Sequence, residues 1–96
     1  MSNHFATLAR ECAVVLRRVL TGEIKSRGDL ELAWPPAAED FPILDDVRDD
    51  VFEYWFLEPD VSYREVIQTS ARILENAPDD PHQTADLLQR AIDELP

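Results

Sequence analysis

Carboxylate side chains gather between residues 45 and 53, and no other stretch of the sequence offers as much for chemistry. The pairs Asp45-Asp46 and Asp49-Asp50 are followed by Glu53. Carboxylates at this density can bind a divalent cation, serve as acid and base in a reaction, or attract a positively charged macromolecule. Each kind of chemistry requires different spacings and neighbours, which can be tested against the sequence.

A metal site is the first possibility. A calcium loop takes its ligands from alternate positions and needs a glycine to turn the chain. These acids instead lie in a glycine-free segment with helical periodicity. A carboxylate di-metal site would use Glu-x-x-His motifs on facing helices, and the sequence contains none. We therefore expect no metal and no cofactor.

Residues suited to catalysis are few. His4 and His82 are expected near the starts of the first and last helices, where histidine is usually solvated. Cys12 lies in an apolar stripe, where a thiol is usually an inert small hydrophobe. The sequence has no glycine-rich phosphate loop, no nucleophile elbow and no HExxH motif. We expect that the protein is not an enzyme.

The negative charge is unevenly distributed along the 96 residues, whose formal net charge is −11. Residues 29–62 contain eleven acids and one arginine, a net charge of −10, whereas residues 1–28 have a net charge of +3. An acidic surface opposes binding to nucleic acid, because such binding requires cationic side chains that displace counterions. It also opposes binding to anionic membranes. The expected partner is therefore a basic protein, with no direct binding to nucleic acid or membrane.

Apolar residues recur at spacings of three and four in most of the chain, which predicts amphipathic helices. The expected helices are 3–21, 42–57, 62–77 and 81–95. Residues 23–34 fit either a short helix or an extended segment. The sequence thus predicts an all-α fold, a single domain over 1–96. It would be a small antiparallel bundle of four helices with an irregular 23–41 connection.

Residues that end and cap helices support these boundaries. Gly22 is placed to end the first helix with a positive φ. Ser62 with Glu65, and Asp80 with Gln83, have the spacing of N-terminal caps. The expected core positions are Leu8, Val15, Val47, Val51, Ile67, Leu74, Leu88 and Ile92.

A helical projection of residues 42–57 separates a core face from an acidic face. With Leu44 at 0°, a turn of about 100° per residue places the carboxylates between about 100° and 240°. Phe52 and Phe56 fall at about 80° and 120°, beside the carboxylates, where they could anchor an interface. The expected partner-binding residues are Asp45, Asp46, Asp49, Phe52, Glu53 and Phe56.

Two structural explanations compete with this interpretation. The acids can simply solvate the outer face of a helix, or pair with Arg10, Arg17 and Arg18 of the first helix. The two phenylalanines can pack under the loop at residues 34–36. Either arrangement would remove the need for a partner.

Small size, acidity and the lack of catalytic groups make the chain similar in general character to bacterial immunity proteins, a compositional likeness that rests on no motif. The expected function is an immunity or inhibitor protein that neutralises a basic toxin such as a nuclease, whose site must attract phosphate. A phage-type DNA mimic and a structural or adaptor bundle are the alternatives.

The absence of a signal-like start and of a long apolar run predicts a cytoplasmic protein. Eight arginines against one lysine hint at a GC-rich, bacterial coding sequence.

Overall fold

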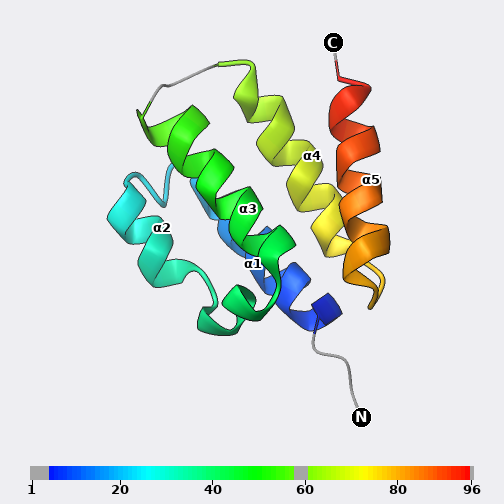
Figure 1. Cartoon of the computed structure of the whole chain (residues 1–96). Helices are drawn as coiled ribbons and strands as arrows, with labels where there is room; N and C mark the ends of the chain where they lie inside the picture. The colour runs from blue at the N-terminus through cyan, green and yellow to red at the C-terminus, as the bar shows by residue number, and fades with distance from the viewer. Residues whose placement is uncertain (1–4, 58–60, 96) are drawn as a thin grey trace.

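A computed structural model describes residues 5–57 and 61–95, and within these ranges the chain is all-α (Figure 1). Five α-helices occur there, joined by a 3-10 segment, η1, and a π-helical segment, η2. The elements are α1 (Phe5–Leu20), α2 (Arg27–Ala33), η1 (Pro36–Asp40), α3 (Pro42–Val51), η2 (Phe52–Leu57), α4 (Tyr63–Glu75) and α5 (Pro81–Asp93). No helix in the described ranges has the length and apolarity to cross a bilayer.

The all-α prediction is confirmed, but a bundle of four helices does not describe the fold. The four expected helices correspond to α1, to α3 with η2, to α4 and to α5, while α2 is a fifth. Ser26 caps α2 by accepting a hydrogen bond from the Asp29 N–H at 3.2 Å. The helix ends before Trp34, which is extended because it precedes a proline.

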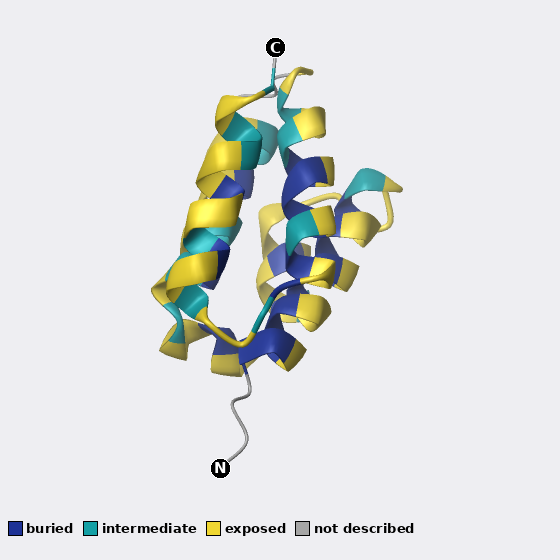
Figure 2. Ribbon diagram, turned by 90° about the vertical axis from the view of Figure 1, so that its right-hand side faces the viewer, coloured by how far each residue is buried: buried dark blue, intermediate teal, exposed yellow. Residues whose placement is uncertain are grey.

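The helices enclose one core in which α1 is central. Helix α4 packs along α1, and α5 packs along α4 (Figure 1). Figure 2 shows buried residues on the inward faces of the helices and exposed residues on the outward faces. Leu16, Leu44 and Leu74 are completely buried in this core. Six of the eight expected core residues are buried, whereas Val47 and Ile92 are only half-buried.

The predicted helix ends are partly confirmed. Gly22 follows α1 with a φ of +84°. Asp80 caps α5 by accepting hydrogen bonds from the backbone N–H groups of His82 and Gln83. Ser62 stands at the predicted N-cap position of α4, but it has helical backbone angles and its side chain makes no capping hydrogen bond.

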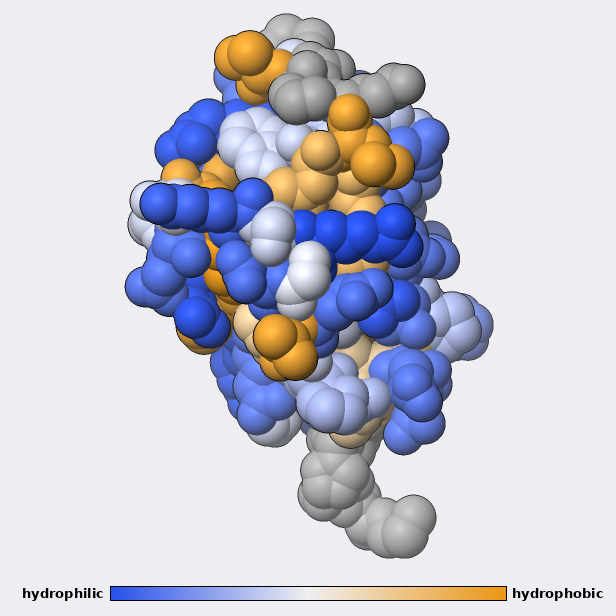
Figure 3. Space-filling model, turned by 90° about the vertical axis from the view of Figure 1, so that its left-hand side faces the viewer, coloured by the Kyte–Doolittle hydropathy of each residue, from blue (hydrophilic) through white to orange (hydrophobic). Residues whose placement is uncertain are grey.

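The side of the molecule that carries α2 is mainly hydrophilic, with small hydrophobic areas scattered over it (Figure 3). Such isolated apolar side chains are common on protein surfaces. The exposed Leu32 of α2, which is 89% accessible, is one example.

Candidate functional site

Phe52, expected on the outer surface, is buried, with 6% of its surface accessible. The guanidinium of Arg27 in α2 lies over its ring, 4.6 Å from the ring centroid, and that of Arg48 lies 5.7 Å away. A cation held over an aromatic face is attracted to the electron density of the ring. The expectation that Phe52 faces solvent and anchors a partner is therefore wrong.

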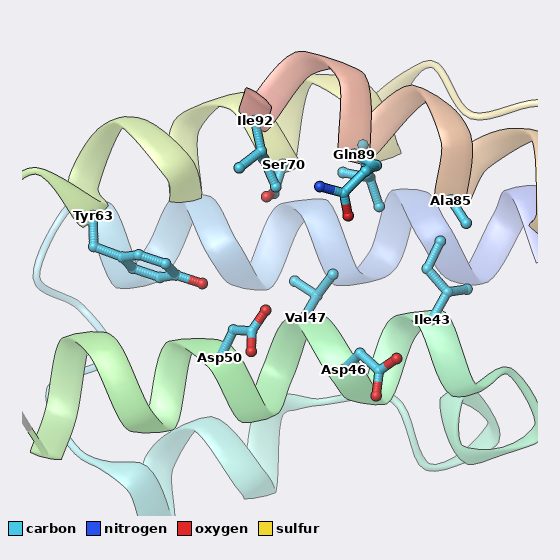
Figure 4. Close-up of a pocket in the computed structure, with 10 residues that line it drawn as sticks. Ile43, Asp46, Val47, Asp50, Tyr63, Ser70, Ala85, Gln89 and Ile92 are labelled. Carbon is cyan, nitrogen blue, oxygen red and sulfur yellow. The ribbon is translucent and has the colours of Figure 1, made fainter. Parts of the chain in front are cut away.

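The projection failed at Phe52 because it assumed that α3 buries one face only. Helix α2 lies beside α3 (Figures 1 and 4) and covers the flank on which Phe52 projects. Phe56, in η2, is half-buried and packs against the core. The π-helical segment closes wider turns than an α-helix, so a fixed angle per residue no longer holds beyond Val51. Both phenylalanines therefore contribute to the core.

The carboxylates of α3 and η2 are exposed, with one exception. Asp45 is half-buried and lies 3.8 Å from Arg48, which also lies 3.4 Å from Asp49. Among the described residues, no other cationic side chain forms an ion pair with these carboxylates. We call the exposed set the acidic face; it consists of Asp46, Asp49, Asp50 and Glu53.

Two of the three arginines of α1, Arg17 and Arg18, pair with carboxylates outside the acidic face, and no ion pair in the described part of the chain joins Arg10 to that face. Arg17 makes a two-pronged contact with Glu75 of α4, with nitrogen–oxygen distances of 2.8 and 3.1 Å. This hydrogen-bonded pairing holds the pKa of Glu75 below its ordinary value. Arg18 pairs with Glu23. Pairing of these two arginines with the acidic face, one of the competing explanations, is thus not observed.

Crowding on the acidic face affects Asp50 most. The pKa of Asp50 is raised above its ordinary value, first by partial burial and then by the negative charges of Asp46, Glu53 and Asp49. Partial burial, and after it repulsion from these groups, makes the ionised carboxylate costly to hold in the folded protein. A positive charge placed next to Asp50 would remove part of that cost.

A groove runs beside this carboxylate between α3 and α5, with residues of α4 at its base (Figure 4). Its volume is about 260 Å³. Val47 and Ile92, which were expected in the core, face each other across it and are half-buried for that reason. The lining residues are Ile43, Asp46, Val47, Asp50, Tyr63, Ser70, Ala85, Leu88, Gln89 and Ile92.

Polar groups point into the groove from several helices. Figure 4 shows the Tyr63 hydroxyl, the Asp50 carboxylate and the Gln89 amide directed toward the space between α3 and α5. Burial and the nearby Asp50 raise the pKa of Tyr63 above its usual range, so the hydroxyl keeps its proton and can donate. The sequence pattern gave no sign that α3 and α5 stand apart there.

The remaining candidates for chemistry are placed as follows. Cys12 is completely buried, and burial raises its pKa to about 12. His82 is exposed, and His4 lies outside the described residues. In the ranges 5–57 and 61–95, no group of three or more histidine, cysteine or acidic side chains is arranged to hold a metal ion.

Comparisons of the chain with protein-family models, with curated proteins and with solved structures find no match. Within the described ranges, the acidic face and the adjoining groove bring carboxylates next to partly exposed aliphatic side chains.

Proposed function

We propose that this protein is a non-catalytic protein-binding domain that acts as an immunity or inhibitor protein. It would bind and neutralise a cognate basic toxin, such as a nuclease, in the cytoplasm of a bacterial cell. The observation that carries the proposal is the acidic face of α3 and η2, where Asp46, Asp50 and Glu53 have no cationic partner among the described residues. Like charges one turn apart destabilise a helix, and a cationic partner would remove that cost.

Inhibition would occur by occlusion. A nuclease must present positive charge where it binds phosphate, and that charge attracts an acidic surface. Long-range attraction would speed the encounter, and close contacts would then slow dissociation. Neither step needs a catalytic residue on the inhibitor.

The close contacts cannot come from Phe52, which is buried. Tyr54 and Leu57 of η2 are 42% and 66% accessible and flank the acidic face at Glu53. An exposed aromatic and an exposed aliphatic side chain next to carboxylates fit the arrangement of an interface anchor with a charged rim. These two residues replace the phenylalanines in the proposed surface.

The test is protection of cells from a toxin encoded beside this gene. A variant with Asp46→Asn, Asp49→Asn, Asp50→Asn and Glu53→Gln should lose protection. It should also associate with the purified toxin at least tenfold more slowly at low salt. A matched control removes four exposed acids elsewhere: Glu11→Gln, Glu65→Gln, Asp86→Asn and Glu94→Gln.

Both variants have the same net charge, so general electrostatics affects them equally. Selective loss of protection in the first variant would support the acidic face as the binding surface. Equal protection by both variants, or a neighbouring gene product that the wild-type chain fails to bind, would refute the proposal.

A further inference from the structure

The groove between α3 and α5 differs from the acidic face in that aliphatic side chains make up about half of its lining residues. Ile43 and Val47 lie one turn apart on one wall, and Ala85 and Ile92 lie on the other (Figure 4). Leu88 of α5, which is buried, also lines the groove. At 1.5 Å per residue, the α3 wall exposes about one helical turn of aliphatic surface, roughly 6 Å, and the α5 wall about two turns, roughly 10 Å.

The charge of the groove is confined to one wall. Asp46 and Asp50, one turn apart on α3, line it, whereas the α5 wall contributes no carboxylate. A molecule in the groove would therefore meet aliphatic surface along the middle and two negative charges along one edge. The complementary surface is an apolar ridge with positive charges one turn apart on one side of it.

An amphipathic helix with lysine or arginine beside its apolar face has this pattern. An extended peptide fits less well, because the walls are helices whose backbone groups are already paired and offer no sheet edge. An anionic membrane would be repelled by the two carboxylates. The volume of about 260 Å³ is below that of typical small-molecule sites and suits a few inserted side chains.

We propose that this groove receives one face of a basic amphipathic helix belonging to the protein partner. Apolar side chains of that helix insert between Val47 and Ile92, and cations one turn apart pair with Asp46 and Asp50. The Tyr63 hydroxyl and the Gln89 amide are directed into the same space and can donate hydrogen bonds to the helix. This inference rests on the proposed function and specifies which element of the partner is bound.

The experiment titrates the protein, labelled at valine and isoleucine methyl groups, with a synthetic 14-residue peptide of leucine and lysine. Its leucines follow helical spacing on one face, and a scrambled peptide of identical composition is the control. Saturable shifts at the Val47 and Ile92 methyls, with binding by the scrambled peptide at least tenfold weaker, are expected.

Two variants with equal charge change separate the groove from the acidic face. Asp46→Asn with Asp50→Asn should weaken binding of the helical peptide at least tenfold. Asp49→Asn with Glu53→Gln, on the same segment but outside the groove lining, should weaken it much less. Ile92→Ala should also weaken it, whereas Val14→Ala, at an exposed valine of α1, should not.

Equal loss in the two charge variants, shifts that avoid Val47 and Ile92, or equal binding of the two peptides would overturn the groove proposal. Failure to bind either peptide would overturn it too. The proposed function is judged separately, by protection from the toxin. If the protein protects cells through Asp49 and Glu53 but does not bind the helical peptide, the proposed function would stand and the groove proposal would be wrong.

Discussion

At the scale of single residues, Phe52 shows how an interface candidate becomes part of the core. Its ring is buried beneath Arg27 and near Arg48. Phe52→Ala should therefore destabilise the fold by about 3–5 kcal/mol, a large share of the stability of a small domain. Urea denaturation measures the loss, and Phe52→Leu should cost much less. A Phe52→Ala protein with wild-type stability would place the ring outside the core.

Asp50 should contribute to the pH dependence of stability in the direction opposite to that of most carboxylates: its contribution improves as the pH falls. Because the folded protein raises its pKa, the ionised carboxylate disfavours folding, and this penalty disappears as Asp50 becomes protonated on acidification. Asp50→Asn should therefore stabilise the protein at pH 7, by about 0.2–0.5 kcal/mol from relief of the repulsion with Asp46 one turn away.

Thermal denaturation of both proteins at several pH values measures this difference. The stability gained from Asp50→Asn should vanish well below pH 3.8, the ordinary pKa of an aspartate side chain. There Asp50 is protonated, so the aspartate and the asparagine are both neutral. Asp86→Asn, the same charge change on α5, serves as the control. A gain from Asp50→Asn that persists unchanged at low pH would show that repulsion is not its cause.

Cys12 should be unreactive in the folded protein. Complete burial and a pKa raised to about 12 leave almost no thiolate at pH 8. A thiol reagent should label the native protein slowly, at a rate that increases with urea as the chain opens. Rapid labelling without denaturant would contradict the burial of this side of α1.

At the scale of elements, α2 decides which flank of α3 is covered. Ser26 begins α2 by accepting the Asp29 N–H, so Ser26→Ala should destabilise the protein by about 0.5–2 kcal/mol. Ser26→Asp, which keeps an accepting oxygen, should restore most of the loss. Equilibrium unfolding compares the three proteins, and equal loss in both variants would exclude capping as the reason.

The sequence was informative wherever an element has one buried stripe. The positions of α1, of α3 with η2, of α4 and of α5 follow from apolar periodicity, from Gly22 and from Asp80, whereas the change to a π-helix after Val51 does not. It was uninformative about α2, where Leu30 and Leu32 alternate in a segment that also fits an extended strand. Without α2, Phe52 was expected on the solvent-exposed face of the 42–57 helix. Periodicity gives the direction of a side chain, but it does not show which neighbouring helix covers that side chain.

The groove escaped sequence analysis for a related reason. Val47 and Ile92 belong to the apolar stripes of their helices and were assigned to the core with the rest. Whether two such stripes meet or leave a gap depends on how the helices are arranged in space, and composition does not record this. The acidic residues were easier to place, because four of the five carboxylates between residues 45 and 53 are exposed.

At the scale of the whole molecule, the net charge of −11 must oppose folding. The described fold measures 40 × 31 × 19 Å, so the charges repel one another across distances of this order. The Debye length is about 30 Å at 0.01 M salt and about 8 Å at 0.15 M. Repulsion therefore acts across most of the molecule in the first condition and only between neighbours in the second.

Raising sodium chloride from 0.01 to 0.15 M should thus stabilise the protein, by about 1–2 kcal/mol, even though salt also weakens attractive pairs such as Arg17 with Glu75. A change of 1 kcal/mol corresponds to about 4–8 °C in Tm for a domain of this size. The variant that neutralises Asp46, Asp49, Asp50 and Glu53 should melt higher at low salt and respond less to added salt. A Tm that falls with salt in the wild-type protein would mean that attractive pairs outweigh the repulsion, and the acidic face would then carry no cost for a basic partner to relieve.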